Sequence, residues 1–459
     1  MLKELLKPEI KELIELHQWS DLREVLGSWE PPEIADLMLD VEESDRVLLF
    51  RSLPRQISAD VFSYLDSEQQ DELLRELTNQ ETREILAQLT PDDRTTLLEE
   101  LPAEATQKLL NLLSPEVLKE ARQLLGYPEK SIGRLTTPHF VSIRADWTIE
   151  QALEHIRNYG KLSETINRIY VTDSNGVLVD DIMLKAFIFA NPKDSVHSIM
   201  DLNVISVSAF DDQEEAVRAM EKYDIPALPV VDSGGVLIGI VTFDDVMDIS
   251  EEEATEDFQK FGGMEALDKP YNTISFFGMV RKRAGWLVIL FLGEMLTATA
   301  LSYFESALEK AIVLSLFLPL IMSSGGNSGS QAATLMVRAI SLGEVTLRDW
   351  WWVMRREFLS GLLLGAILGV IGFFRIVVWS KFSNIYGEHY FLVALTVSFS
   401  LVGVVLWGSL SGSMLPFLLK KLKFDPAASS APFVATLVDV TGIVIYFSFA
   451  VWLLRGTLL

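Results

Sequence analysis

One carboxylate, Asp439, lies within an apolar stretch that is long enough to cross a membrane. An ionised carboxylate facing lipid costs about 2.5 to 3.5 kcal/mol on insertion scales, so this side chain must face water, an ion or a partner. It could be a protonated or hydrogen-bonded Asp that serves helix packing, or a ligand for an ion in a pore. In the second case Ala435, one turn earlier on the same helical face, could contribute its carbonyl oxygen.

A second unusual segment, residues 319–331 (PLIMSSGGNSGSQ), lies in another apolar stretch. Gly325 and Gly329 form a GxxxG pattern, which is typical of closely packed membrane helices. Asn327 and Gln331 are polar and one turn apart, and irregular backbone at membrane depth is tolerated only where it is buried or lines water. The segment lacks the Gly-Lys-Ser/Thr ending of a nucleotide-binding loop. We therefore expect a pore lining, with simple helix packing as the alternative.

The elements that must position these residues are five apolar stretches, each long enough to span about 30 Å of hydrocarbon. Basic residues cluster before the first stretch, between the second and third, and between the fourth and fifth. By the positive-inside rule, the N-terminal half is expected in the cytosol and the C-terminus outside a cell (inner) membrane. The five stretches are residues 284–304, 311–337, 359–378, 391–419 and 427–454.

The charge of the chain divides it into two parts. Residues 1–269 carry 25 basic and 55 acidic side chains, a net charge of −30, whereas residues 270–459 carry 14 and 9, a net charge of +5. The strong negative charge of residues 1–269 argues against nucleic-acid binding and favours cationic partners. The sequence contains no Cys, which leaves carboxylates, carbonyls and water as ligands, a set that suits hard cations. The N-terminus lacks a signal-peptide pattern, so we expect no export of this half.

The first ~125 residues are expected to form short helices, with a repeat of 48 residues. Asp45-Arg46 recurs as Asp93-Arg94, and Leu53-Pro54 recurs as Leu101-Pro102. A repeat of this length with helical patterning is typical of stacked helix pairs, so we expect a small α-solenoid.

A second repeat follows, made of short β runs and Gly turns. Residues 141–143 and 170–178 are echoed by residues 205–207 and 229–237. These tandem units resemble CBS modules, β-α-β-β-α folds that associate in pairs and serve in regulation. The second unit ends in GIVTFDD, in which the resemblance implies that Thr242 and Asp245 could hold a nucleotide ribose, such as that of ATP. The first unit has no such hydroxyl in its segment VDDIM.

The whole chain resembles the MgtE family of Mg²⁺ channels. The resemblance rests on five features in order: the acidic solenoid, the paired CBS modules, an acidic connecting helix ended by Gly262-Gly263, the GGNSGSQ segment and the segment from Asp425-Pro426 to Asp439. Membership would imply a homodimer in the lipid membrane, a pore ion held through water at Asp439, and cytosolic Mg²⁺ sites that close the pore. Pore candidates are Asp439, Ala435 and Asn327; the implied sensor ligands are Asp92, Asp93, Asp224, Asp245, Asp248, Glu253, Glu256, Asp257 and Asp425.

The predicted fold class is a multidomain membrane protein that combines an N-terminal α-solenoid, a tandem CBS (α+β) pair, a connecting helix and a five-helix transmembrane domain. Its rival is a membrane-tethered nucleotide sensor whose spans serve only as anchors. We expect no enzyme, because no nucleophile–base pair or hydrolase motif is present. The expected boundaries are 1–130 for the solenoid, 131–195 and 196–250 for the CBS modules, 251–270 for the connecting helix and 271–459 for the channel domain.

Overall fold

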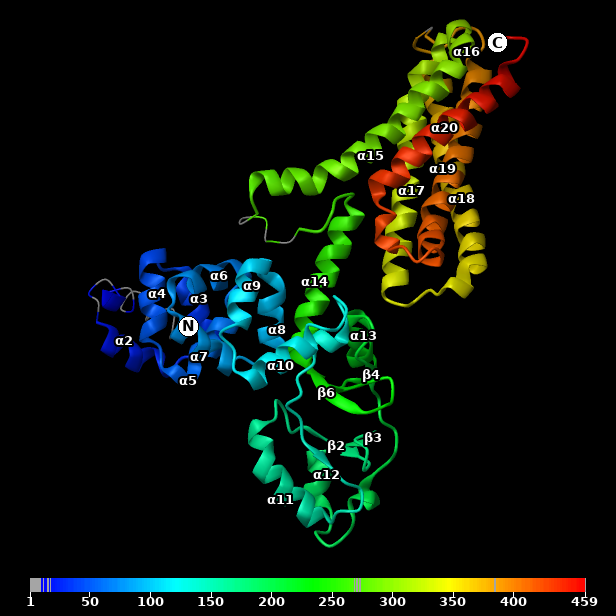
Figure 1. The fold of residues 1–459 in the computed structure, drawn as a ribbon. Helices are drawn as coiled ribbons and strands as arrows, with labels where there is room; N and C mark the ends of the chain where they lie inside the picture. Colours follow the sequence, from blue (N-terminus) through cyan, green and yellow to red (C-terminus); the bar gives the residue numbers. More distant parts are fainter. Residues whose placement is uncertain are drawn as a thin grey trace. The chain divides into compact units, whose positions relative to one another are not determined.

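The computed structural model describes residues 10, 12–14, 16, 18–267, 269, 271, 274–383 and 385–458. The chain forms two compact units, residues 1–251 and residues 252–459 (Figure 1). The first unit contains the solenoid helices and both CBS modules, and the second contains the end of the connecting helix and the membrane helices. Each unit is described by itself.

The solenoid consists of short helices, many of which begin at a Pro or at a capping side chain. Asp66 and Thr78 each form a capping box with the residue three positions later, which satisfies free N–H groups at the helix start. The helices are α2 (Trp19–Leu26), α3 (Pro31–Leu39), α4 (Glu43–Ser52), α5 (Arg55–Ser63), α6 (Ser67–Glu76), α7 (Asn79–Gln88), α8 (Pro91–Glu100), α9 (Ala103–Leu110) and α10 (Pro115–Leu124).

Equivalent contacts of two arginines bear out the 48-residue repeat. Arg46 donates to the carbonyl of Met38 and to Glu72, 2.9 Å away, while Arg94 donates to the carbonyl of Leu86 and to Glu120, 2.6 Å away. In each case the carbonyl lies 8 positions before the arginine and the glutamate 26 positions after it. The two halves of the solenoid are therefore held by the same polar tie, as the sequence predicts.

The two CBS modules have matching sheets. In the first, β1 (Ser142–Ile143) pairs in parallel with β2 (Arg168–Thr172), which pairs antiparallel with β3 (Leu178–Met183); β4 (Val207–Ser208), β5 (Ala227–Val231) and β6 (Leu237–Thr242) repeat the order. Bridges between Thr137 and Ile240 and between Val177 and Val236 join the modules. Their helices are α11 (Ile149–Tyr159), α12 (Leu184–Phe189) and α13 (Gln213–Tyr223).

The connecting helix α14 (Phe243–Phe261) begins eight residues before the expected boundary. Strand β6 leads directly into it, so the last helix of the second CBS module and the connecting helix are one element. It ends before Gly262, as the Gly pair predicts, and Gly263 adopts a left-handed φ of +75°. Residues 268 and 270, which belong to the expected connecting helix 251–270, lie outside the described residues.

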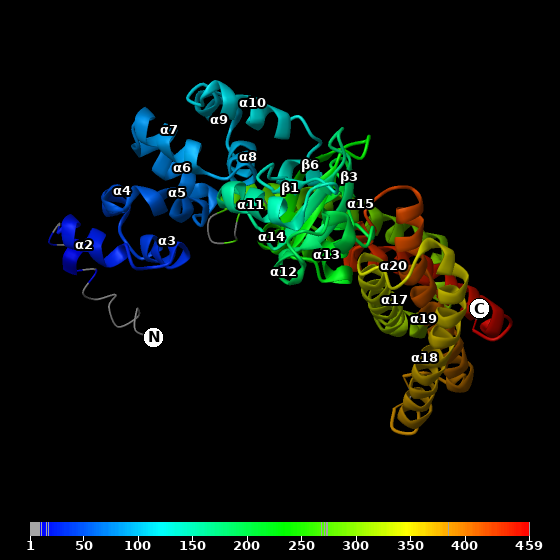
Figure 2. The ribbon, with the colours of Figure 1, turned by 90° about the horizontal axis from the view of Figure 1, so that it is seen from below.

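Five of the described helices are long and apolar enough to span a membrane, which agrees with the five predicted stretches. In Figures 1 and 2, α17, α18 and α19 lie side by side, and α20 packs against α17 and α19. The first span, α15, is mostly unburied by its own chain and packs mainly against α20. The helices are α15 (Phe276–Tyr303), α17 (Leu318–Ser341), α18 (Trp350–Trp379), α19 (Tyr390–Lys421) and α20 (Ala431–Leu454), with the short α16 (Glu305–Lys310) after α15.

Small residues bring α17 and α19 into close contact. A methyl group at Gly412 would lie 2.1 Å from the carbonyl oxygen of Gly329, and one at Gly408 would lie 2.4 Å from that of Gly325. Ser328 and Ser409 share a hydrogen bond of 2.8 Å across the same interface. The GxxxG pattern is thus a packing face, as one of the two alternatives predicts.

Candidate functional site

Asp439 is the ninth residue of the 24-residue apolar helix α20 and its side chain is half-buried. Its electrostatic surroundings include Glu294 of α15, and none of the residues that the structure describes donates a hydrogen bond to it. A carboxylate at this depth without a protein donor can be satisfied by water or a cation.

The other pore candidates lie on α17 and α20, where these helices meet. Gly326 packs against Ala435, because a methyl group at Gly326 would lie 3.5 Å from the Ala435 Cβ. Asn327 follows Gly326 and its exposed side chain donates to the Ser323 hydroxyl, 3.4 Å away. Gln331 is also exposed, whereas Gly325 and Gly329 on the opposite face are buried. One helix therefore combines a packing face with a polar face.

The expected irregular backbone in this segment is absent. The helix α17 is continuous from Leu318 to Ser341. Ser324 donates to the carbonyl of Leu320, 2.6 Å away, and Thr334 donates to that of Ser330, 2.8 Å away, so the hydroxyl groups return to the helix's own backbone. Gly residues are compatible with the helix here because the close approach of α19 compensates for their low helix propensity.

At the end of α14, three of the expected sensor residues come together. Asp425 caps the short helix before α20 by accepting from the Ala427 N–H, 2.8 Å away, and also accepts from Lys260 of α14, 2.7 Å away. Glu256 forms an ion pair with the same lysine. The neighbouring Asp257 accepts from the Ser341 hydroxyl at the end of α17, 3.1 Å away. These contacts tie the end of the connecting helix to the membrane helices within the second unit.

A second group of carboxylates forms within the first unit, between the solenoid and the second CBS module. Asp92 is 6% exposed and its Oδ1 has no hydrogen-bond partner among the described residues. Burial and the charge of Asp92 raise the pKa of Asp93 to about 6, while burial and the charges of Asp92 and Asp244 raise the pKa of Asp245 to about 8. Each of these carboxylates makes it harder to ionise the others, which a bound cation would reverse.

Two of the remaining sensor candidates lie close enough to these groups to interact with them: burial and the charge of Asp244 raise the pKa of Asp248, and burial and, more weakly, the charge of Glu253 raise that of Asp257. Asp224 ends α13 in a left-handed conformation with φ of +52° and is exposed, and Asp248 is exposed on α14. Glu253 is half-buried on the same helix. In the part of the chain that the structure describes, no three His, Asp or Glu side chains are arranged to hold a metal ion.

The nucleotide candidates differ between the two CBS modules. Thr242 donates to the Asp245 carboxylate, 2.7 Å away, so the pair expected to hold a ribose is formed but lies beside Asp244 and Asp92. In the first module, Met183 has the strand position of Thr242, since Met183 pairs with Arg168 as Thr242 pairs with Ala227. Ala186 then replaces the carboxylate three positions later. The first module does not fit a nucleotide at this motif.

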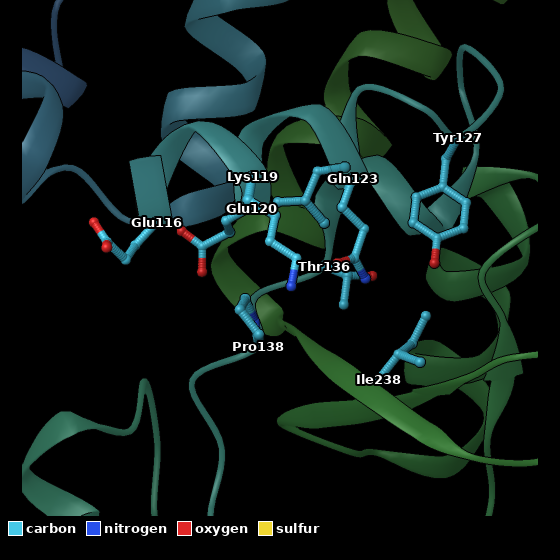
Figure 3. A pocket seen from close by; sticks show the side chains of 9 residues that line it. Glu116, Lys119, Glu120, Gln123, Tyr127, Thr136, Pro138 and Ile238 are labelled. Atoms are coloured by element: carbon cyan, nitrogen blue, oxygen red, sulfur yellow. The ribbon is translucent and has the colours of Figure 1, made fainter. Parts of the chain in front are cut away.

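A pocket of about 200 Å³ lies within the first unit but does not contain the Thr242–Asp245 pair. Figure 3 shows polar side chains of α10 along it, one basic and two acidic. Glu120 is already paired with Arg94. The mixed charge argues against a phosphate site. The lining residues are Glu116, Lys119, Glu120, Gln123, Leu124, Tyr127, Thr136, Pro138 and Ile238.

Several residues at these sites were not identified from the sequence. Lys260 and Ser341 contact Asp425 and Asp257, but their partners lie 165 and 84 positions away, so no local pattern reveals them. Asp244 could have been found, because it is adjacent to Asp245 in the acidic first turn of α14. Glu294 is recognisable in the sequence as a charged residue within an apolar stretch, but the sequence does not reveal that it lies near Asp439.

Comparisons with known proteins cover almost the whole chain. Family models match residues 29–130 (MgtE intracellular N domain), residues 132–188 and 195–252 (CBS domain) and residues 318–449 (divalent cation transporter). The magnesium transporter MgtE of Thermus thermophilus is 39% identical over 99% of this chain and 100% of its own length. That of Bacillus subtilis is 32% identical over 72% of this chain and 71% of its own.

Two solved structures resemble the N-terminal half of the chain. The cytosolic domain of the Mg²⁺ channel MgtE in complex with ATP is 36% identical, with a TM-score of 0.51, and covers 53% of this chain and 100% of that one. The soluble part of a magnesium transporter is 31% identical, with a TM-score of 0.52, and covers 55% of this chain and 99% of that one.

Proposed function

The chain belongs to the MgtE family of magnesium transporters, and we propose that it conducts Mg²⁺ into the cell through a pore in which Asp439 attracts the ion. The observation that carries this proposal is the unpaired carboxylate within the apolar helix α20. Mg²⁺ loses water reluctantly and is usually held by one or two carboxylates plus retained waters. A pore with few charged groups could pass a partly hydrated ion.

The functional assembly that we propose is a homodimer, in which two Asp439 carboxylates face each other across the pore. The weak burial of α15 by its own chain supports an arrangement in which lipid or a second copy covers that helix. The polar face of α17, with Asn327 and Gln331 exposed, could then line the pore beside the Ala435 carbonyl. Basic residues at the ends of the spans support a cytosolic N-terminal half and an external C-terminus.

The two carboxylate groups are proposed as the Mg²⁺ sensor. When Mg²⁺ is scarce, ionising Asp92, Asp93 and Asp245 together is unfavourable, because burial and the charges of neighbouring carboxylates raise the pKa of Asp93 and of Asp245. Bound Mg²⁺ would bridge such groups and favour a compact state that closes the pore. An ion shifts this equilibrium only by its higher affinity for the closed state.

Adenine nucleotide is a secondary ligand in this proposal. ATP is bound in the related cytosolic structure, and here the Thr242–Asp245 pair offers one set of ribose contacts per chain. The neighbouring carboxylates of Asp92, Asp93 and Asp244 would repel the phosphates, so binding should be weak. Calorimetry of the cytosolic half should therefore give at most one weak ATP site per chain, and two equivalent tight sites would contradict this assignment.

Ion flux in liposomes tests the proposed function against the rival of a membrane-tethered nucleotide sensor. Purified protein should carry Mg²⁺ into vesicles and should do so in the absence of any nucleotide. An anchor has no need for the unpaired carboxylate of Asp439, so it should give no flux above empty vesicles. A protein that binds ATP tightly but carries no Mg²⁺ would favour the rival.

A further inference from the structure

Lys260, in the last turn of α14, contacts two of the proposed sensor carboxylates. Its Nζ lies 2.7 Å from Oδ2 of Asp425 and also forms an ion pair with Glu256, one turn earlier on the same helix. All three side chains are partly buried, with exposures of 31% for Lys260, 20% for Glu256 and 36% for Asp425. The ammonium therefore connects the connecting helix to the segment that leads into α20.

The surroundings of Lys260 are strongly acidic. Burial raises the pKa of the neighbouring Asp257, the Ser341 hydroxyl lowers it, and the charge of Asp425 raises it further. Burial alone would lower the pKa of Lys260, but hydrogen bonds to Asp425 and Glu256 raise it above its ordinary value. Two carboxylates, Glu256 and Asp425, thus contact one ammonium group, and Asp257 lies close enough to interact electrostatically with Lys260 and Asp425. A divalent cation could neutralise these carboxylates more completely than the single charge of Lys260.

We propose that Lys260 is an internal counter-ion that competes with Mg²⁺ for Asp425 and Glu256 and so sets the Mg²⁺ concentration at which the channel closes. An ammonium is a compact single charge on a flexible stem, so it can leave the carboxylates without a change of fold. Mg²⁺ must displace it before bridging α14 to the membrane helices. Displacing Lys260 costs free energy, so it weakens the affinity of Asp425 and Glu256 for regulatory Mg²⁺. This inference rests on the proposed closure by cytosolic Mg²⁺.

The test uses full-length protein in liposomes, with Mg²⁺ varied on the side of the acidic half, and compares the variants K260M, K260Q and K260R with wild type. K260M and K260Q remove the competing charge, so the Mg²⁺ midpoint for closure should fall roughly two- to fivefold, the range expected for one partly exposed ion pair. K260R keeps the charge and should keep the wild-type midpoint. K310A, which removes an exposed charge from α16, is the matched control and should change nothing.

A second measurement does not depend on flux. Resistance of the full-length protein to thermolysin should rise with Mg²⁺, and in K260M and K260Q this rise should occur at a correspondingly lower Mg²⁺ concentration. If Lys260 is instead a structural tie that Mg²⁺ never displaces, its removal should leave both midpoints unchanged or raise them, and either result overturns the proposal. A wild-type channel that Mg²⁺ does not close would overturn the proposed gating itself, and this inference with it.

Discussion

At the scale of single residues, two charged side chains are central to the proposed channel: Asp439 within α20 and Lys260 in the last turn of α14. A carboxylate within an apolar stretch conflicts with its surroundings, so Asp439 stands out from the sequence alone. Lys260 is one basic residue in an acidic helix and looks like an ordinary surface charge. Its proposed role depends on the hydrogen bond to Asp425, 165 positions later, and only folding brings the two residues together.

Replacing Asp439 with Ala should abolish Mg²⁺ flux while membrane insertion is retained, because the change removes the pore charge and an insertion penalty of about 2.5 to 3.5 kcal/mol together. Ser448 is a matched control on the same helix, since its hydroxyl only donates to the carbonyl of Val444. S448A should conduct like wild type. Uptake of Mg²⁺ into vesicles, normalised to inserted protein, gives the comparison, and wild-type flux through D439A would refute the pore assignment.

At the scale of elements, the sequence predicted the five spans because apolar length is a local property. The contacts between these spans are harder to predict from the sequence. The GxxxG pattern indicated a packing face, but its partner, the glycines of α19, became clear only in the structure. The expectation of irregular backbone was wrong because α19 approaches α17 closely enough to stabilise a continuous helix.

The substitution G412A should weaken the packing of α17 on α19, because its methyl group would meet the Gly329 carbonyl at 2.1 Å. Overpacking of this kind typically costs about 1 to 3 kcal/mol. G285A is the matched control: the nearest atom to its methyl group is a carboxylate oxygen of Glu265 at 3.5 Å. The apparent melting temperature in detergent should fall for G412A and hold for G285A. Equal melting temperatures for G412A and wild type would contradict the close packing.

At the scale of the whole molecule, the acidic charge lies mainly in residues 1–269. The number of acidic residues in 1–269 and the family resemblance predict a sensor, but they do not predict which of these residues lie close together. The structure gathers Asp92, Asp93 and Asp245 in one group and Glu256, Asp257 and Asp425 in another, while Asp224 stays apart. Long-range packing decides such groupings, and one sequence does not encode it in any local pattern.

If carboxylates sense Mg²⁺ through specific bridging, the ion should protect the N-terminal half from proteolysis far better than NaCl at equal ionic strength. Screening weakens repulsion among the carboxylates but does not join them. A fragment of residues 1–267 in which Asp245, Asp248, Glu253, Glu256 and Asp257 are neutralised should show little Mg²⁺-specific protection. The rate of thermolysin cleavage measures this effect. Equal protection by NaCl and Mg²⁺ would leave general screening as the cause.

Mg²⁺ flux through the full-length channel, measured in vesicles with and without millimolar Mg²⁺ on the side of the acidic half, tests the account most directly. Wild type should conduct when Mg²⁺ is scarce and close when it is plentiful. The channel neutralised at the same five carboxylates, and one lacking residues 1–130, should conduct but fail to close, since neither change alters a span. A neutralised channel that closes at the wild-type Mg²⁺ concentration would contradict the account.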